Sequence, residues 1–487
     1  MDRADQPVKQ LTNRIGGNGA RSENLEMLPM TDPATGDVLA RVPISGPDEV
    51  GRAVDAARAA QPEWAATPVP RRARLMFHAQ QLIEAHRDEL AALIALENGK
   101  ALNDARAEVT RGLETLEFAA GIPHLMKGST STGVGSGVDA ETRFYPVGVV
   151  AGITPFNFPA MIPLWMIPIA IAAGNAFVLK PSEQTPLTAE LLIDLFAEAG
   201  LPDGVLNAVH GAAATAEALV THPGVDAVSF VGSAAVARSV YTAAAAAGKR
   251  VQALAGAKNF LIVLDDAPLE STADAVFASA FGNAGQRCLA GSVVLATGGI
   301  AQPLTEALVA RVHAAPHGPG SDPESVITPV TNQASQDRIL AAVDEAVREG
   351  ARVLTGGRAI DGPGFFLAPT IIADAGPETD VVRKELFGPT LAIMTVTDLD
   401  EAITFANSSE YGNSSSLFTS SGGAAHTFRE HIEAGMLGIN IGVPAPIGYL
   451  PFSGWKGSFY GDLHVNGMDG VRFYTRQKAI TTRWPKL

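Results

Sequence analysis

The chain alternates between short apolar runs and longer segments whose apolar positions recur with helical spacing, most clearly over residues 149–247. Four apolar runs read as buried strands: GVVAGITP, AFVLKPS, VLNAVHG and AVSFVGS. Helices are predicted from Ala160 onward and over residues 188–199, 213–220 and 234–247. Strands that alternate with helices of this length predict parallel βαβ units in a doubly wound sheet.

A second series of the same kind follows residue 259 and predicts a separate α/β domain. Its strands are FLIVL, SVVLAT, LAIMTV and GMLGINIG, with a helix over residues 272–282 after the first of them. Ahead of the first series, helical spacing covers residues 47–65, 71–98 and 102–118. The predicted fold class is therefore α/β, with two doubly wound, Rossmann-like domains.

Two further segments predict strands outside these domains. Residues 130–148 are rich in hydroxyl side chains and glycine. Near the C-terminus, RFYTRQKAITTRW (472–484) alternates polar and apolar residues. This second segment is suited to edge pairing in an oligomer.

One stretch, residues 155–179, contains no charged residue and is long enough to be a candidate membrane span. Pro159, Pro163 and Pro168 interrupt it, which makes a continuous spanning helix unfavourable. We therefore expect a buried helix followed by a buried strand. Residues 1–26 mix charges with glycine and asparagine and lack the apolar core of a signal peptide, so they predict a flexible arm.

Composition narrows the classes of function. The chain has 487 residues, 46% of them hydrophobic, which predicts two or three domains of a well-packed enzyme. Its formal net charge of −15 opposes binding to nucleic acid. The histidines form no HExxH pattern and there is only one cysteine, so no metal site is expected. We expect a cytoplasmic protein that binds neither nucleic acid nor membranes.

The single cysteine, Cys288, lies in the loop FGNAGQRCLAG and has no partner for an intramolecular disulfide. Packing is one explanation, because a free cysteine is often a small buried apolar residue. Chemistry is the other, because Gly282 and Gly285 let the backbone approach a ligand closely and Arg287 places a cation beside the thiol. Cys288 is therefore a candidate nucleophile.

No GxGxxG motif follows any predicted strand, so the local signals for a dinucleotide site are weak. Gly232 and Ser233 lie where a strand runs into a helix, which can bind phosphate or can be a plain tight turn. Lys180 and Glu183 follow another strand, at the end where ligands bind in open sheets. These two side chains fit ribose hydroxyl groups, and they equally fit a solvated loop.

Five motifs in register resemble the aldehyde dehydrogenase superfamily, from about residue 28 to the C-terminus. They are PFNFP (155–159), LKPSEQTP (179–186), FVGS (230–233), GQRC (285–288) and KELFGP (384–389). The resemblance implies a homodimer or homotetramer. It also implies an NAD-binding domain, a catalytic domain and oligomerisation strands, at residues 27–129 with 145–253, 254–450, and 130–144 with 470–487 respectively.

This resemblance implies roles for individual residues. Cys288 would add to an aldehyde and, after hydride transfer to NAD, carry the acyl group as a thioester. Asn157 and the backbone N–H of Cys288 would form the oxyanion hole, and Arg287 would help the thiol to ionise. Glu183 would favour NAD over NADP by repelling a 2′-phosphate. Ten residues would contact the dinucleotide: Thr154, Phe156, Lys180, Glu183, Gln184, Gly232, Ser233, Ala255, Glu385 and Phe387.

The segment LAGAKN (254–259) departs from the hydrolytic members of the superfamily, which carry a glutamate where this chain has Leu254. No aspartate or glutamate occurs between residues 227 and 264 to replace it. Water is poorly activated without that base, whereas a thiol is an intrinsically strong nucleophile. The missing carboxylate therefore predicts acyl transfer to coenzyme A as a co-substrate.

Three stretches are similar to the coenzyme A-dependent methylmalonate-semialdehyde dehydrogenases: VQALAGAKN (251–259), GINIGVPAP (438–446) and PFSGWKGSF (451–459). This resemblance implies oxidative decarboxylation of methylmalonate or malonate semialdehyde to propionyl- or acetyl-coenzyme A. Arg111 and Arg287 would bind the substrate carboxylate, since guanidinium pairs with carboxylate bidentately. From the sequence alone, an exposed helix arginine paired with Glu108 or Glu114 is the favoured interpretation of Arg111.

Two alternatives stay open at this point. One is an aldehyde dehydrogenase that releases a free carboxylic acid by means of another base. The other is a catalytically silent member of the superfamily, retained as a binding or structural oligomer, against which Cys288, Asn157 and Glu385 argue. The sequence does not decide the substrate's chain length, the coenzyme A site, or dimer against tetramer.

Overall fold

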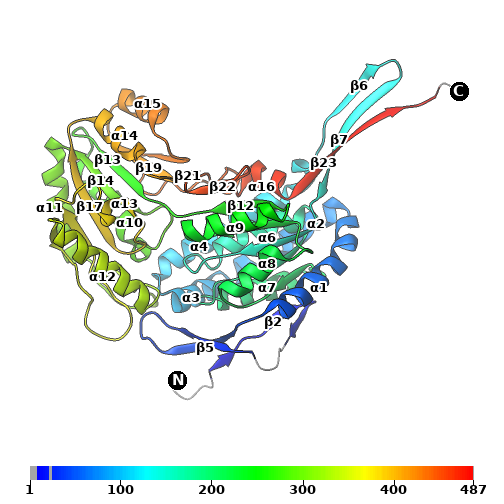
Figure 1. The fold of residues 1–487 in the computed structure, drawn as a ribbon, viewed down its shortest axis with the longest axis horizontal. Coiled ribbons are helices and arrows are strands. Elements are labelled where there is room, and N and C mark those ends of the chain that lie inside the picture. The colour runs from blue at the N-terminus through cyan, green and yellow to red at the C-terminus, as the bar shows by residue number, and fades with distance from the viewer. Residues whose placement is uncertain (1–7, 21–24, 486–487) are drawn as a thin grey trace.

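The structure, a computed structural model, describes residues 8–20 and 25–485. Its first half is built on an eight-stranded sheet with a parallel centre, which lies beside a second α/β layer (Figure 1). Antiparallel strands complete the two edges of this first sheet. In spatial order its strands are β22 (Phe459–Gly461), β12 (Arg250–Leu254), β11 (Ala227–Val231), β8 (Val149–Ile153), β9 (Ala176–Lys180), β10 (Leu206–Ala208), β2 (Asn13–Ile15) and β3 (Asn18–Ala20).

Helices cover both faces of this sheet. On one face, apolar side chains of three helices pack into a common core: α1 (Pro47–Ala66), α8 (Ala213–Thr221) and α9 (Ala234–Ala246). The other face carries α2 (Val69–Ala85), α3 (Arg87–Asn98), α4 (Leu102–Ala120), α5 (Ile122–Leu125), α6 (Met161–Ala172), α7 (Leu187–Glu198) and α16 (Gly467–Phe473).

The uncharged stretch over residues 155–179 forms α6 and β9. Every residue of both elements is buried, which confirms the expected buried helix and buried strand. Among the residues that the structure describes, no helix combines the length and the apolar character needed to cross a membrane.

The second half contains a seven-stranded sheet that is parallel except at one edge. In spatial order the strands are β15 (Arg352–Thr355), β16 (Thr370–Ala373), β17 (Thr390–Val396), β14 (Gly291–Thr297), β13 (Asn259–Val263), β19 (Ser414–Phe418) and β20 (Met436–Ile439). One face is covered by α10 (Leu269–Phe281) and α11 (Gly298–Ala314). The other face is covered by α12 (Gln333–Arg348), α13 (Asp380–Arg383), α14 (Leu399–Asn407) and α15 (Gly422–His431).

The strand order of the first sheet reverses beside β8. From β8 the chain adds β9 and β10 on one side, and then returns to add β11 and β12 on the other. In open α/β sheets, a ligand crevice opens outside the carboxyl ends of the strands at such a reversal. Thr154 directly follows β8 at that point, and Gly232 directly follows β11. The predicted fold class, α/β with two doubly wound sheets, is confirmed.

A three-stranded antiparallel ribbon projects from the first half of the molecule (Figure 1). It consists, in spatial order, of β23 (Thr475–Arg483), β7 (Val138–Pro146) and β6 (Thr130–Gly135). The two segments predicted as strands outside the domains therefore pair with each other. Arg472 and Phe473, expected at the start of the C-terminal strand, end α16 instead. The role of this ribbon in oligomerisation stays a prediction.

Part of the expected flexible arm is ordered, which corrects that expectation for residues 8–20. Within it, β2 pairs with β10 at the edge of the first sheet, and β1 (Lys9–Gln10) joins a small sheet with β5 (Val38–Pro43) and β4 (Met27–Thr31). Hydrogen bonds between backbone groups hold these residues in place, and the polar side chains of the segment gave no sign of such pairing. Residues 1–7 and 21–24 of that arm lie outside the described residues.

One other expectation differs from the structure. The helix expected over residues 71–98 is two helices, because His86 leaves helical geometry at φ −98° and ψ 15°. After residue 450, where the expected catalytic segment ends, the chain returns to the first sheet, where β22 pairs with β12. On its way it forms β21 (Trp455–Lys456), which pairs with β18 (Tyr411–Gly412). The domain bounds themselves stay a prediction.

Candidate active site

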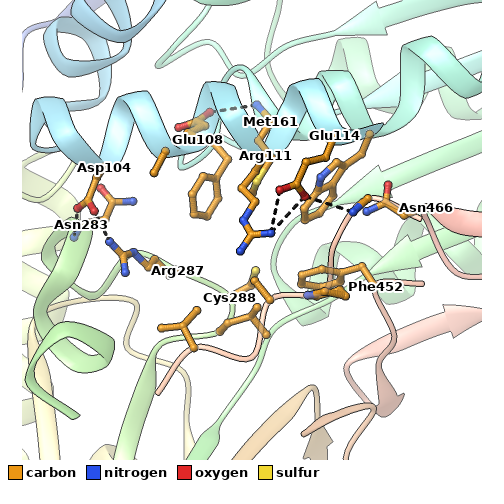
Figure 2. A pocket seen from close by; sticks show the side chains of 18 of the residues that line it. Asp104, Glu108, Arg111, Glu114, Met161, Asn283, Arg287, Cys288, Phe452 and Asn466 are labelled. Atoms are coloured by element: carbon orange, nitrogen blue, oxygen red, sulfur yellow. Dashed lines mark hydrogen bonds and ion pairs between the residues drawn. The ribbon is translucent and has the colours of Figure 1, made fainter. Parts of the chain in front are cut away.

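Cys288 lines a pocket of about 260 Å³ that lies between the two halves of the molecule. Its walls come from α4, from the loop before α6, from the Cys288 loop and from residues 443–466 (Figure 2). Apolar side chains such as Phe158, Trp165 and Phe452 form much of the lining. Three cations and three anions share the pocket: Lys100, Arg111, Arg287, Asp104, Glu108 and Glu114.

The loop before Cys288 has an unusual backbone. Asn283 and Ala284 have positive φ angles of 52° and 50°, and Gly285 follows at 69°. A Cβ atom on Gly285 would lie 2.1 Å from the carbonyl oxygen of Gly388, so only glycine fits there. Left-handed non-glycine residues are characteristic of functional loops that the surrounding structure holds in place.

Two asparagine side chains fix the backbone of Cys288 itself. Asn259 Nδ2 and Asn413 Nδ2 donate to the Cys288 carbonyl oxygen at 2.9 and 2.7 Å. The thiol is partly buried, at the edge of the apolar core of the first half. The cysteine is therefore a rigidly placed group that faces a pocket.

The charge of Arg287 acts on the thiol in the expected direction, but other effects on the thiol are larger. Burial raises the pKa of Cys288 to about 12, and the charge of Glu385 raises it further. Backbone hydrogen bonds and the charge of Arg287 act in the opposite direction and are smaller effects. Arg287 has a limited effect because it pairs with Asp104, Nη2 to Oδ1, at 2.8 Å. The surroundings of Cys288 therefore favour the protonated thiol over the thiolate.

Asn157 lies beside the Cys288 loop, as an oxyanion donor must. Its side chain is 3% exposed, and Nδ2 donates to the carbonyl oxygen of Gln286 at 3.0 Å. An amide nitrogen carries two hydrogens, so one N–H stays available for an oxygen near the thiol.

Arg111 and Arg287 enter the pocket from different elements. Figure 2 shows the Arg111 side chain reaching from α4 toward Cys288, while Arg287 lies beside Asp104. Arg111 Nη1 pairs with both carboxylate oxygens of Glu114, at 3.1 and 3.2 Å. Arg111 is thus both the helix arginine paired with Glu114 and a pocket residue.

The residues expected to hold a dinucleotide gather at the reversal of the strand order. Thr154, Ser233 and Lys180 follow or end the adjacent strands β8, β11 and β9. Ser233 is the N-cap residue of α9, and its side chain accepts no capping hydrogen bond, which leaves the first N–H groups of α9 for a ligand. Gly232 packs against Phe230, since a Cβ there would lie 2.5 Å from the phenyl ring. A phosphate group fits this arrangement.

Lys180 and Glu183 occupy the carboxyl end of β9. Lys180 is 4% exposed, and its Nζ donates to Glu183 Oε2 at 3.3 Å and to the Pro181 carbonyl at 2.7 Å. Burial lowers the pKa of Lys180, and the charge of Glu183 opposes that shift. Next to them, Gln184 Oε1 accepts from Thr331 Oγ1 at 2.6 Å and so faces the second half of the molecule.

The other four expected cofactor residues come from the region between the two sheets. Phe156 and Phe387 meet edge to face with ring centres 5.8 Å apart. Ala255 is buried and its N–H donates to the Ser458 carbonyl at 2.9 Å. Glu385 Oε1 accepts from the Ala257 N–H at 3.1 Å, and burial raises its pKa to about 7.

Leu254 ends β12 and is 5% exposed within the apolar core. The absence of a carboxylate on residues 227–264 does not leave the thiol without one, because the fold brings Glu385 close enough to affect its pKa. Sequence reasoning also missed Asp104, Glu108 and Glu114 as pocket residues. The signal was present as the spacing of Asp104, Glu108 and Arg111 along one face of α4.

Known proteins resemble this chain over nearly its whole length. Residues 20–480 match the sequence profile of the Aldehyde dehydrogenase family. Malonate-semialdehyde dehydrogenase 1 of Geobacillus thermodenitrificans is 50% identical over 480 residues, which cover 98% of this chain and 99% of that protein. The crystal structure of methylmalonate-semialdehyde dehydrogenase from Oceanimonas doudoroffii matches with a TM-score of 0.96 and 41% identity, covering 98% of this chain and 99% of that one.

A second solved structure carries a cofactor. A Sinorhizobium meliloti 1021 protein, provisionally named methylmalonate-semialdehyde dehydrogenase and solved as a complex with NAD, matches with a TM-score of 0.97 and 41% identity. The match covers 99% of each chain.

Proposed function

Because the chain belongs to the aldehyde dehydrogenase family, an enzyme family that oxidises aldehydes, we propose that it acts on malonate or methylmalonate semialdehyde. In this proposal NAD accepts the hydride, carbon dioxide is lost, and coenzyme A receives the acyl group. The observation that carries the proposal is the convergence of Arg111, Arg287 and Cys288 on one small pocket.

The two arginines suit an aldehyde that carries a carboxylate. Each guanidinium group has five N–H donors, and the pairings with Glu114 and Asp104 use only part of them. The remaining donors form charge-assisted hydrogen bonds with a substrate carboxylate. A pocket of about 260 Å³ favours a short substrate, in which the carboxylate and the aldehyde are only a few bonds apart.

The reversal of the strand order supports NAD as the cofactor. Ser233 and the open N-terminus of α9 fit a phosphate group, and Lys180 with Glu183 fits ribose hydroxyl groups. Glu183 favours NAD over NADP because its negative charge opposes a 2′-phosphate. NAD supplies a hydride acceptor when it is bound.

Cys288 carries the covalent chemistry. The S–H bond of Cys288 first breaks, its proton passes to water, and the thiolate adds to the aldehyde carbon. The resulting alkoxide accepts hydrogen bonds from Asn157 Nδ2 and from the Cys288 N–H. Loss of hydride from that carbon leaves an acyl thioester on the sulfur. The substrate carboxylate is then β to the thioester carbonyl, so carbon dioxide leaves with its bonding pair remaining as an enolate, which takes up a proton.

The acyl group leaves Cys288 by attack of a second thiol. Leu254 cannot accept a proton, so water has no base at this position. Transfer from one thiol to another changes the bond energy little and needs less assistance. Coenzyme A is therefore the acceptor that fits the residues around the thioester.

Glu385 favours a second candidate function, release of the free acid. Its carboxylate acts on the pKa of Cys288, and its own pKa of about 7 suits a general base near neutral pH. In this alternative Glu385 takes the place of the glutamate that Leu254 replaces, and water attacks the thioester.

Single-turnover and steady-state kinetics separate the two. Enzyme, NAD and malonate semialdehyde are mixed with and without coenzyme A, NADH is followed by absorbance, and products are identified by mass spectrometry. We expect only a burst equivalent to the enzyme concentration without coenzyme A, and sustained turnover with acetyl-coenzyme A and carbon dioxide when it is present. Full-rate turnover to a free acid without coenzyme A contradicts the proposal.

Two variants sharpen the result. Leu254→Glu introduces the missing carboxylate and is expected to raise turnover without coenzyme A, whereas Leu254→Gln, of the same size, is the matched control without a base. If Glu385 is the base of a hydrolytic enzyme, Glu385→Gln abolishes the turnover that occurs without coenzyme A.

A further inference from the structure

A buried ion pair lies in the wall of the active-site pocket. Lys100 Nζ is 2.6 Å from Glu108 Oε2, and neither side chain is exposed to solvent. Lys100 lies between α3 and α4, and Glu108 lies in α4. Removing two charges from water costs free energy that their attraction only partly offsets, so such a pair is weak evidence for stability. The groups that are hydrogen-bonded to this ion pair indicate its role.

The pair holds the backbone of Asn157 at its carbonyl group and the backbone of the residues that begin α6. Lys100 Nζ donates to the carbonyl oxygen of Asn157 at 2.6 Å. Glu108 Oε1 accepts from the N–H groups of Ala160 and Met161, at 2.8 and 3.1 Å. These N–H groups begin α6, so the carboxylate also caps that helix. Two elements outside the loop thereby fix its position.

Lys100 makes most of its polar contacts within the protein. An ammonium group has three N–H donors; two bind Glu108 and Asn157, and the ammonium lies 4.1 Å from the centre of the Phe158 ring. Burial lowers the pKa of Lys100, and the charge of Glu108 opposes that shift. Lys100 lines the pocket, but its ammonium group is committed mainly to Glu108, Asn157 and the Phe158 ring.

Asn157 needs this support because it connects its own loop to the cysteine loop. Its backbone is held from the side of α3 and α4, while its Nδ2 binds the carbonyl oxygen of Gln286 in the cysteine loop. A donor to a developing alkoxide must be in place before the reaction, and a displacement of about 1 Å costs on the order of 10²-fold in rate.

We propose that Lys100 and Glu108 are positioning residues that hold the Asn157 amide at the oxyanion site. The inference rests on the proposed function, in which Asn157 donates a hydrogen bond to the alkoxide formed on Cys288. Among the described residues, no hydrogen bond or ion pair joins Lys100 or Glu108 to Arg111 or Arg287, although the charge of Arg287 lowers the pKa of Lys100. Because the pair holds the Asn157 backbone directly, its main effect belongs to the chemical step rather than to binding of the substrate carboxylate.

A double-mutant cycle tests this coupling. Lys100→Met/Glu108→Gln removes both charges together, which avoids leaving one buried charge unpaired. With malonate semialdehyde, NAD and coenzyme A, we expect kcat to fall by roughly 10-fold or more while KM for the semialdehyde stays within about twofold. In an Asn157→Ala background the same change is expected to lower kcat by less than about twofold, since the positioned amide is already gone.

Glu97→Gln is the matched control for a structural effect. Glu97 is also a buried carboxylate that caps a helix, through the N–H groups of Leu187 and Thr188 at 2.7 and 3.0 Å. It makes no hydrogen bond to the Asn157 loop, so kcat is expected to stay within about twofold of the parent. Thermal unfolding of each variant reports loss of folding separately.

The outcomes are distinct. Equal fold losses of kcat in the two backgrounds overturn the positioning role and leave the role of Asn157 intact. An Asn157→Ala variant with unchanged kcat overturns both the oxyanion assignment and this inference. If the Lys100→Met/Glu108→Gln variant does not fold, Lys100→Gln/Glu108→Gln repeats the cycle, because the glutamine carbonyl at position 108 still accepts from the α6 N–H groups and no buried charge is left unpaired.

Discussion

At the scale of single residues, each pocket arginine is already paired with an acid of the protein, Arg111 with Glu114 and Arg287 with Asp104. With Lys100 and Glu108 included, the charges that line the pocket balance. In the proposed function, a substrate carboxylate is therefore attracted by directed hydrogen bonds more than by a net positive field. The shape of the guanidinium group becomes decisive, which lysine does not reproduce.

Arg111→Lys and Arg287→Lys test this argument. We expect each to lower kcat/KM for malonate semialdehyde by roughly 10- to 100-fold, because the bidentate contact is lost while the charge is kept. With propanal, which has no carboxylate, kcat/KM is expected to stay within about threefold of the parent. Steady-state NADH formation gives kcat/KM for each aldehyde, and the ratio of the two values is compared between variant and parent.

Arg106→Lys is the control for these variants. Arg106 lies on the same helix and pairs with the exposed Asp88 at 2.9 Å, away from the pocket. Equal losses with the charged and the uncharged aldehyde contradict a role of the arginines in carboxylate recognition.

The nucleophile gives the simplest prediction at this scale. Cys288→Ala removes the only thiol of the chain, so no thioester forms. We expect NADH formation to fall on the order of 10³-fold or more, while NAD binding, measured by titration calorimetry, stays unchanged. Activity close to that of the parent rules out the covalent mechanism.

At the scale of elements, helices of the first half are tied together by buried carboxylates. Glu97 ends α3 but caps α7, and Glu108 lies in α4 but caps α6. Neither α6 nor α7 has a capping side chain of its own at its N-cap residue. A carboxylate at a helix N-terminus is stabilised by the N–H groups and the dipole, yet its burial opposes ionisation.

The titration of Glu97 has a consequence for stability. Burial raises its pKa from 4.5 to about 7 in the folded chain. The folded state binds the proton more tightly than the unfolded chain does, so protonation of Glu97 adds to the free energy of unfolding. This stabilisation is fully present below about pH 4.5 and is lost as the pH rises through about 7. The free energy of unfolding that depends on this proton is on the order of 3 kcal/mol.

Glu97→Gln isolates that contribution. Glutamine keeps the acceptor for Leu187 and Thr188 but does not titrate. We expect the melting temperature of the variant relative to the parent to increase between pH 5 and pH 8, as measured by calorimetry at intervals of half a pH unit. A difference that does not change with pH contradicts the buried, titrating carboxylate.

At the scale of the whole molecule, the β6–β7–β23 ribbon is poorly covered. All residues of β6 are exposed, and most residues of β23 are exposed or half-buried. In the described residues, β23 is the last strand of this sheet and has no strand on its outer side. A long uncovered edge is a template for pairing with another chain. We therefore expect the ribbon to pack against a second copy.

Truncation tests this expectation. A chain that ends at Thr475 lacks β23, and we expect its mass by sedimentation equilibrium to fall from that of a dimer or tetramer to that of one chain. A chain that ends at Arg483 keeps β23 and is the control with an unchanged assembly. A full-length protein with the mass of a single chain contradicts the role of the ribbon.

Several features of this protein follow from the sequence by itself. The alternation of apolar runs with helical segments predicted both doubly wound sheets, because period-2 and period-3.6 burial are local properties of the chain. The uncharged residues of α6 and β9 indicated their burial for the same reason. The solitary Cys288 in its glycine-containing loop and the leucine at position 254 also predicted, from the sequence alone, a nucleophile and a missing base; both roles stay predictions.

Other features were decided only by the tertiary structure. Order in residues 8–20 comes from pairing with strands far along the chain, and Glu385 reaches the thiol from about a hundred residues away in the sequence. The pairing of Arg287 with Asp104, which limits its effect on the thiol, joins two distant segments. Local patterns report which face of an element is buried, whereas the pKa of a group and the partners of a charge depend on distances that only the packed fold sets.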